Sequence, residues 1–171
     1  MLDFAAHWNV YAVALLLFVT LQRLGELVIA RRNTRRLLEQ GAFEAAPEPY
    51  GLIVLLHAAW LGGLWLLAPE RQPDPILTLV YGLLQVARFW VLATLGERWT
   101  TRVIILPGAP LVRSGPYRFV SHPNYCVVVG EILVLPCVFG LYAYALVFTL
   151  LNAAALTIRI RAEDHALHSR R

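Results

Sequence analysis

Lysine is missing from this sequence of 171 residues, so all 15 of its Lys and Arg side chains are arginines. Cysteine is scarce: Cys126 and Cys137 occur inside one apolar stretch, without the spacing of a disulfide framework or a zinc site. We expect both thiols to be reduced and buried. The sequence also lacks a glycine-rich phosphate loop, a Ser-His-Asp arrangement and a metal-ligand spacing. These absences argue against P-loop chemistry, triad hydrolysis and a metal centre.

Apolar residues are in excess. They make up 58% of the chain, with a mean hydropathy of +0.59, whereas soluble domains hold roughly 45–50%. A membrane protein is therefore expected. The net charge of +4 suits an anionic bilayer surface. No nucleic-acid partner is expected, because no basic face occurs outside the loops.

The N-terminal apolar run is expected to be mature structure and not a cleaved signal peptide. It lacks a basic first region, and Gln22, Arg23 and Glu26 follow where small residues would mark cleavage.

Apolar segments long enough to cross a bilayer cover residues 10–30, 50–68 and 76–95. A fourth block, residues 126–158, is too long for one helix, and Pro136 with Gly140 near its middle predicts a tight helical hairpin with short or tilted arms. The expected fold is all-α, with about five transmembrane helices in a single domain of residues 1–171. Residues 1–95 would form three N-terminal helices, and residues 96–171 the half that bears the motifs. Residues 31–50 predict a short surface helix followed by a connector.

The distribution of arginine predicts how the helices are oriented. If five helices alternate, residues 31–49, 96–125 and 159–171 share one side of the membrane, and they hold twelve arginines against Arg71 alone on the other side. The positive-inside rule then places the N-terminus outside and the C-terminus with the site on the cytoplasmic side.

Ionisable groups inside the spans need partners, because an isolated charge in hydrocarbon is costly. Arg23 and Glu26, three residues apart on one helix, are expected to pair. Arg88 has no local acid, so Glu26 or Glu131 on another helix should serve it. Glu131 follows the most polar segment of the chain and could belong to a site, form a salt bridge with Arg88, or do both. For His57 we favour a hydrogen-bonded packing role over a ligand role.

The polar segment covers residues 115–131 and reads GPYRFVSHPNYCVVVGE. Its two prolines stiffen the approach to a helix, and its rings, arginine, histidine and asparagine could hold a flat, polar, partly charged ligand. The tail RIRAED is predicted to emerge on the same membrane side. The residues alone indicate a cytosolic polar ligand that meets a lipidic partner.

These two segments, with the residues LGERWTTRVIILPGAPLVRS before the first, resemble the C-terminal half of the isoprenylcysteine carboxyl methyltransferase family, small integral-membrane enzymes that use S-adenosylmethionine. Ser121 stands where the family usually has arginine, and Asp164 replaces a second glutamate. The matching positions are Gly115, Pro116, Tyr117, Arg118, His122, Pro123, Tyr125, Glu131, Arg159 and Glu163.

The resemblance implies transfer of a methyl group from S-adenosylmethionine to an oxygen of a lipophilic acceptor at the cytosol–membrane boundary. The acceptor would be the carboxylate of a prenylated cysteine-like molecule or the hydroxyl of an alkylpyrone- or alkylresorcinol-like lipid. Members that methylate prenylated cysteine carry an aromatic-rich extension after the acidic pair, which corresponds to Glu163 and Asp164 here, and this sequence has none there. The overall form is more similar to bacterial relatives, so a bacterial inner membrane is the expected location.

The resemblance also implies roles for particular residues. A carboxylate acceptor would need only an orienting arginine, Arg159 or Arg118, whereas a hydroxyl would need a base, His122 or Glu163. The implied catalytic residues are His122, Arg159 and Glu163, and Glu131 with Arg88 would be polar groups facing the acceptor or fixing the helices. The implied cofactor contacts are Tyr117, Arg118, His122, Pro123, Tyr125, Arg159, Glu163 and Asp164.

Two other functions fit parts of the pattern. A non-enzymatic helical scaffold or binding protein would use the polar clusters only to fix how helices pack. A nicotinamide-dependent membrane reductase would share a similar arrangement of C-terminal helices, although 171 residues is short for one.

Overall fold

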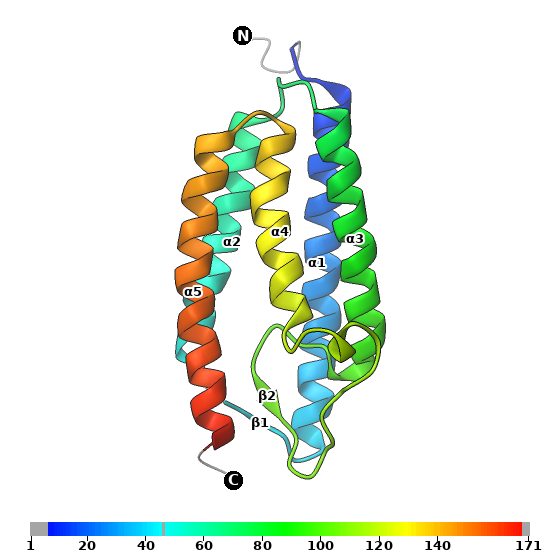
Figure 1. Ribbon diagram of the computed structural model, residues 1–171, viewed down its shortest axis with the longest axis vertical. Coiled ribbons are helices and arrows are strands. Elements are labelled where there is room, and N and C mark those ends of the chain that lie inside the picture. Colours follow the sequence, from blue (N-terminus) through cyan, green and yellow to red (C-terminus); the bar gives the residue numbers. More distant parts are fainter. Residues whose placement is uncertain (1–6, 46, 169–171) are drawn as a thin grey trace.

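The computed structural model describes residues 7–45 and 47–168, except for the side chains of residues 48, 49 and 162–168. Its five α-helices form one elongated bundle in which they run up and down in turn (Figure 1). They are α1 Val10–Glu39, α2 Glu48–Leu67, α3 Pro75–Leu95, α4 Pro123–Val138 and α5 Tyr142–His168. The prediction of an all-α, polytopic membrane fold is confirmed.

Within the described ranges, four helices are long and apolar enough to cross a bilayer, and α4 is the shorter fifth. Its 16 residues extend roughly 24 Å, less than the ~30 Å of hydrocarbon in a bilayer. The hairpin is as predicted: Gly140 adopts φ +68° between α4 and α5, and Leu141 N–H donates to the Pro136 carbonyl at 3.0 Å. Only one arm is short, however, because α5 has 27 residues.

Helix α1 is longer than the sequence indicates. It begins at the Asn9 cap, whose side chain accepts from the backbone N–H groups of Tyr11 and Ala12. It then continues to Glu39, where Gly41 with φ +89° turns the chain. The separate surface helix predicted after residue 30 is therefore wrong, because no glycine or proline between residues 31 and 39 interrupts the helix.

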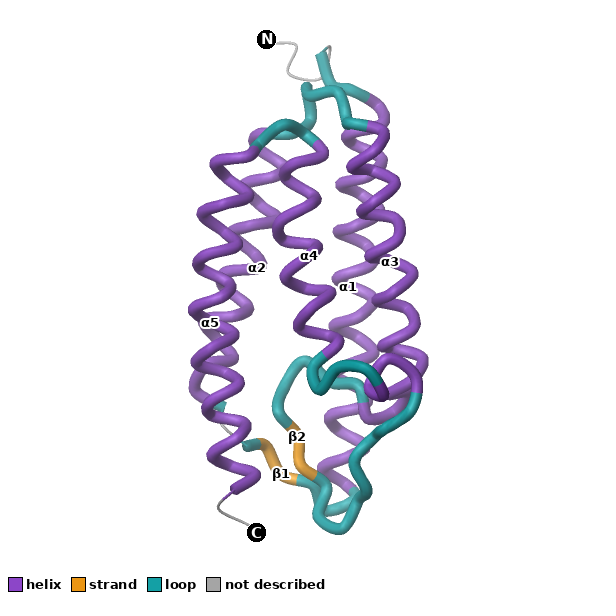
Figure 2. The backbone as a smooth tube through the Cα atoms, in the orientation of Figure 1, coloured by secondary structure: helices purple, strands orange, loops and turns teal. Residues whose placement is uncertain are grey.

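Helix α4 lies between the α2–α5 and α1–α3 pairs (Figure 2), and glycines allow close packing between helices. It packs against α3 and α5, and α5 also packs against α2. A Cβ on Gly130 of α4 would lie 2.9 Å from Leu84 of α3, and one on Gly63 of α2 would collide with the Tyr144 hydroxyl of α5. That hydroxyl donates to the Trp60 carbonyl at 2.8 Å. The tight packing leaves the large side chains of Leu16, Trp60, Leu64, Ile132 and Leu135 almost fully buried.

A two-residue strand pair that the sequence did not predict ties two connections together. Strand β1 Phe43–Glu44 lies antiparallel to β2 Ile104–Ile105, and Ala45 N–H donates to the Val103 carbonyl at 2.8 Å. The pair crosses the end of the bundle where α5 ends (Figure 1). It links the turn after α1 to the long connector between α3 and α4.

The arginine-rich segments gather at this same end of the bundle, which we call the basic end. The turns between α2 and α3 and between α4 and α5 lie at the other end, with the start of α1. Hydrogen bonds join that end: Asn9 N–H donates to the Pro69 carbonyl at 2.7 Å, and Asp74 N–H to the Val138 carbonyl at 2.8 Å.

The two cysteines are unpaired, but their burial was predicted incorrectly. Cys126 is exposed and Cys137 is partly buried. An apolar stretch does not reveal which helix face looks outward, and Cys126 lies on the outer face of α4, next to the buried Val127.

Candidate functional site

The first motif segment is held against α3 by a glycine turn. Gly115 adopts φ +55°, a conformation that L side chains rarely adopt. A Cβ there would also meet the side chains of Thr94 and Trp90 on α3. The short helix η2, Gly115–Arg118, therefore docks on α3, with Pro116 buried. Tyr117 is half-buried and Arg118 is exposed.

The second motif segment begins α4. His122 is the N-cap with φ −129° and ψ 62°, and Pro123 occupies the first turn, where its missing N–H leaves no hydrogen bond unmade. This start turns the His122 ring onto the Tyr125 ring: their centroids are 5.2 Å apart and the planes 12° from parallel. Two predicted cofactor contacts thus form a stacked pair at the basic end of α4.

Arg159 of α5 joins this pair from a distant part of the sequence. Its Nε donates to the Tyr125 hydroxyl at 3.1 Å, and its Nη2 donates to the Thr101 carbonyl at 2.8 Å. The guanidinium carbon also lies 5.8 Å from the centre of the Tyr125 ring, within reach of a cation–π contact. We call His122, Tyr125, Arg159 and Thr101 the motif cluster.

Two further residues belong near this site: Thr101, which the sequence did not indicate, and Asn124, which was not among the predicted cofactor contacts. Thr101 acts through its backbone carbonyl, which no residue-type pattern can reveal, although it lies within the WTTR part of the family-like segment. Asn124 Oδ1 is buried and has no hydrogen-bond partner among the residues that the structure describes. A buried acceptor without a partner is costly, so it marks a place where a ligand donor could bind.

The positions of the Glu163 and Asp164 side chains relative to the motif cluster are not described. The backbone of α5 carries Glu163 and Asp164, one turn or more beyond Arg159, but their side chains lie outside the described residues. Their catalytic and cofactor-binding roles stay predictions, as does the cofactor role of the exposed Arg118.

A cavity of about 780 Å³ opens between α1 and α2 at the basic end; we call it the α1–α2 cavity. Leu27, Leu38 and Val54 form apolar parts of its wall, and Arg31 and Arg35 add positive charge from α1. Such a wall is apolar toward the membrane and charged toward the end of the bundle, where Glu39 and Glu44 accompany the arginines, and this contrast suits an amphiphilic molecule.

Thr101 belongs both to this cavity and to the motif cluster. Its hydroxyl lies 3.3 Å from the Tyr50 hydroxyl, and Tyr50, Thr101 and Arg102 all line the cavity. The Arg102 guanidinium stacks over the Tyr50 ring at 4.4 Å and pairs with Glu44 at 2.7 Å. The hydrogen bond to the Glu44 carboxylate raises the pKa of Arg102 above its ordinary value, so this cation persists at every physiological pH.

Farther from the basic end, four ionisable side chains pair with one another inside the bundle. Arg88 contacts Glu26 and, at 2.9 Å, Glu131; Arg23 contacts Glu26 at 3.1 Å and Glu131 at 2.7 Å. We call these residues, which come from α1, α3 and α4, the buried charge cluster. Both predicted partners of Arg88 are confirmed.

The cluster balances two positive and two negative charges, as groups removed from water require. Gln85 Nε2 adds a bond of 2.8 Å to Glu131, whose side chain is fully buried. Glu131 and Arg88 thus fix the helices, and an additional role toward an acceptor stays a prediction. His57 Nδ1 lies 2.8 Å from the Ile53 carbonyl, as expected for a packing residue.

The fold and the site together define a class of protein: a polytopic helical membrane protein in which the polar segment of residues 115–131 meets the tail that begins at Arg159. Comparison with known proteins agrees. The model of the Isoprenylcysteine carboxyl methyltransferase (ICMT) family matches residues 76–169, from the start of α3 to the end of α5. The chain belongs to this family and is a membrane methyltransferase.

Two relatives extend the similarity to the N-terminal helices. The chain is 36% identical over 158 residues to the "Uncharacterized protein YpbQ" of Bacillus subtilis (strain 168), which covers 90% of this chain and 94% of the relative. It is 25% identical over 153 residues to an "Uncharacterized protein" of Haemophilus influenzae (strain ATCC 51907 / DSM 11121 / KW20 / Rd), which covers 85% and 88%. No solved structure matches the chain.

Proposed function

We propose that the chain is an S-adenosylmethionine-dependent O-methyltransferase that methylates a lipophilic acceptor at the cytosol–membrane boundary. The observation that carries the proposal is the hydrogen bond from Arg159 of α5 to Tyr125 of α4. It joins the two family-like motifs into one polar cluster, although the two residues lie 34 positions apart in the sequence.

The motif cluster fits the cofactor chemically. The parallel rings of His122 and Tyr125 offer an aromatic surface for a purine. Arg159 can bind a carboxylate, and the buried Asn124 Oδ1, which lacks a partner in the described part of the chain, can accept a hydrogen bond from a ribose hydroxyl. Tyr117, Arg118, Pro123, Glu163 and Asp164 would complete the cofactor site.

The α1–α2 cavity is the proposed acceptor site. An alkyl chain would lie against Leu27 and Val54, and the polar head would lie near Arg102 and Tyr50. Because the Thr101 carbonyl accepts from Arg159 while its hydroxyl is within reach of Tyr50, acceptor and cofactor would approach each other at Thr101. The acceptor would be a carboxylate or a ring hydroxyl on a long alkyl or prenyl chain.

When bound, S-adenosylmethionine supplies an electrophilic methyl carbon. The protein contributes position and removal of water, which are most of what such a displacement needs. A carboxylate acceptor is already a nucleophile, and Arg159 would orient it. A hydroxyl acceptor must lose its proton, and His122 at the start of α4 is the described side chain best suited to take it.

Isothermal calorimetry with S-adenosylhomocysteine tests cofactor binding by the protein in detergent. We expect binding by the wild type and a weaker affinity for Arg159→Ala. Arg161→Ala is the matched control, since Arg161 is exposed on the same helix two residues away. If the folded wild type releases no heat, or if both variants bind as the wild type does, the proposed cofactor site is wrong.

Mass spectrometry of lipid extracts from cells with and without the protein would identify the acceptor. We expect a long-chain acid, pyrone or resorcinol that gains the mass of one methyl group when the protein is present. The gain should disappear for Arg159→Ala and persist for Arg161→Ala.

We also propose that the protein spans a bacterial inner membrane with its N-terminus outside and its basic end in the cytosol. The gathering of arginine-rich segments at one end supports this orientation, and the cofactor is a cytosolic molecule. Reporter fusions at the C-terminus should be active only for a reporter that functions in the cytosol, and the opposite result would reverse the orientation.

A further inference from the structure

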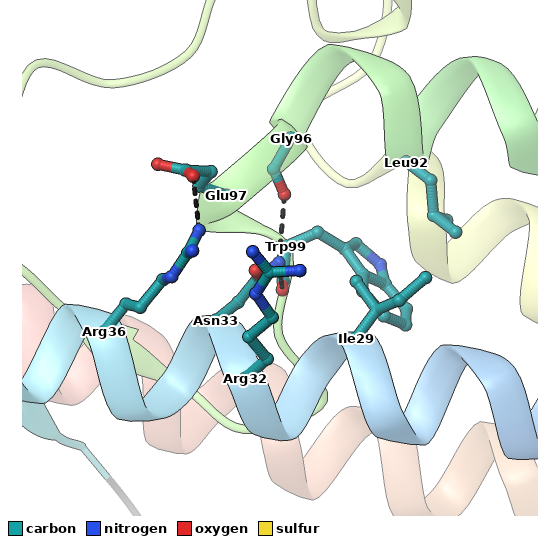
Figure 3. Close-up of a pocket in the computed structure, with 8 residues that line it drawn as sticks. All are labelled: Ile29, Arg32, Asn33, Arg36, Leu92, Gly96, Glu97 and Trp99. Atoms are coloured by element: carbon teal, nitrogen blue, oxygen red, sulfur yellow. Dashed lines mark hydrogen bonds and ion pairs between the residues drawn. The ribbon is translucent and has the colours of Figure 1, made fainter.

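A second hollow lies on the other side of α1 from the α1–α2 cavity (Figure 3). It has a volume of about 370 Å³ and separates α1 from the end of α3; we call it the α1–α3 groove. Ile29, Arg32, Asn33 and Arg36 line it from α1, at the spacing that places residues on one helix face. None of the residues in the motif cluster lines it, so the proposed methyl transfer leaves it without a role.

The wall opposite α1 is held in place by Asn33. Its side-chain amide donates to the carbonyl oxygens of Gly96 at 3.1 Å and Trp99 at 2.9 Å. Trp99 lines the groove and is only 3% exposed, and its indole N–H has no hydrogen-bond partner within the described ranges. The groove is therefore a built feature whose wall does not depend on the two arginines.

The charge of the groove favours an anion. Arg32 is exposed and makes no ion pair or side-chain hydrogen bond with the described residues, and its guanidinium lies beside the groove in Figure 3. Arg36 pairs with Glu97 at 2.6 Å, but these side chains are 41% and 73% exposed. An ion pair this exposed contributes little, so an anionic ligand can compete with Glu97 for Arg36.

The groove also changes from apolar to basic along the bundle axis. Ile29 belongs to the apolar part of α1 and is 49% exposed; Arg32 and Arg36 follow one and two turns later. On α3, Leu92 lines the groove, and Phe89, one turn earlier, is 59% exposed. A ligand that fills it must combine an apolar chain on the membrane side with a negative charge at the basic end.

We propose that the α1–α3 groove binds an anionic phospholipid. The phosphate would contact Arg32 and Arg36, and an acyl chain would lie along Ile29, Leu92 and Phe89. A basic hollow between transmembrane helices at the cytoplasmic boundary is the usual setting for such a headgroup. A soluble anion would make no use of the exposed Ile29 and Phe89.

The test is isothermal calorimetry of the full-length protein in a non-ionic detergent. The titrant is a short-chain phosphatidylglycerol in the same detergent, with phosphatidylcholine of equal chain length and inorganic phosphate as separate arms. We expect the wild type to bind phosphatidylglycerol and to bind the other two much more weakly. Equal affinity for both lipids, or for inorganic phosphate and phosphatidylglycerol, would overturn the proposal.

Variants locate the binding. Losing Arg32 and Arg36 together (R32A with R36A) should weaken phosphatidylglycerol binding roughly 30-fold, because each arginine near an anionic headgroup contributes about fivefold. The control removes two exposed arginines elsewhere at the basic end (R113A with R161A) and should bind as the wild type does. If both double variants lose the same affinity, the lipid responds only to overall charge and the groove is not its site.

Glu97→Gln gives a test of opposite sign. Removing the carboxylate frees Arg36 from its ion pair, so binding of phosphatidylglycerol should become a few-fold tighter. A misfolded or nonspecifically damaged protein cannot produce this gain. Unchanged or weaker binding would contradict competition between Glu97 and the lipid phosphate for Arg36.

Discussion

The buried charge cluster and the motif cluster both rest on arginine, yet they satisfy it differently. In the buried charge cluster, Arg23 and Arg88 each contact the carboxylates of Glu26 and Glu131. In the motif cluster, the hydrogen-bond partners of Arg159 among the described residues are neutral: a hydroxyl and a backbone carbonyl. An arginine neutralised by carboxylates holds helices together, whereas we expect one whose described partners are neutral to be able to bind an anionic group.

The depth of each cluster explains the difference. Arg88 is 5% exposed and Glu131 fully buried, so an uncompensated charge there would be costly. Arg159 is half-buried near the end of the bundle, where water can hydrate its charge until a ligand binds. Stability should therefore depend on the first cluster and ligand binding on the second.

The largest effect is expected for Glu131→Gln. It leaves Arg23 and Arg88 short of one carboxylate in the interior, and breaking a buried ion pair in this way costs about 3–5 kcal/mol of unfolding free energy. Denaturant unfolding in detergent, followed by circular dichroism, would measure the loss. The surface change Glu97→Gln is the control and should cost under about 1 kcal/mol.

A double variant tests whether charge balance alone explains how this cluster contributes to stability. Replacing Arg88 by Met together with Glu131 by Leu removes one cation and one anion, and Arg23 keeps Glu26. Apolar replacement of a whole buried pair is often close to neutral, so most of the stability should return. A double variant as unstable as Glu131→Gln would show that more than charge balance is at stake.

The next effect is expected for Tyr125→Phe, which should impair binding more than stability. The variant keeps the ring that stacks on His122 and removes the hydroxyl that accepts from Arg159. Without this bond the Arg159 guanidinium is no longer held in position for a ligand, so the affinity for S-adenosylhomocysteine should fall about tenfold in calorimetry, which is about 1.4 kcal/mol. A large loss of stability with unchanged affinity would instead place Tyr125 among the packing residues.

Sequence analysis predicted the parts of the molecule that follow from hydrophobicity and charge balance. Long apolar runs specify spanning helices because an unpaired backbone is intolerable in lipid. Arg88 had to find an acid because a lone charge in that setting is costly, and the choice of Glu26 or Glu131 turned out to include both. Arg159 and Tyr125 were singled out by family resemblance, which composition could not have supplied.

The remaining features depend on contacts between distant segments. The carbonyl of Thr101 and the β1–β2 pairing are backbone interactions, so side-chain type does not announce them. No sequence motif singled out Tyr50 and Arg102, which the fold places together beside Thr101. The exposed Cys126 shows the same limit, because hydrophobicity alone does not separate lipid-facing from core-facing positions.

A smaller effect is expected for Asn124→Ala. Its side-chain oxygen is buried and has no partner in the described residues, so removing it should leave the stability of the unliganded protein unchanged or slightly raised. If a ribose hydroxyl binds there, the variant loses one neutral hydrogen bond to the ligand. The binding free energy of S-adenosylhomocysteine should then weaken by about 0.5–1.5 kcal/mol. Calorimetry and thermal unfolding on the same sample would separate the two effects, and unchanged affinity would exclude Asn124 from the cofactor site.

The smallest effect is expected for Glu44→Gln, which breaks the ion pair of Glu44 with Arg102 at the edge of the α1–α2 cavity. The side chains are 24% and 41% exposed, so the loss after screening by solvent should be under about 1 kcal/mol and should shrink further in high salt. Because the pKa of Arg102 is raised, the stability from its charge would fade only as the pH rose through that pKa, far above neutral. Between about pH 6 and pH 9 salt should therefore weaken the pair and pH should not. Thermal unfolding over a matrix of salt and pH would measure the cost. If Glu44→Gln destabilised the protein as much as Glu131→Gln does, depth in the bundle would not separate the arginine–glutamate pairs of this protein.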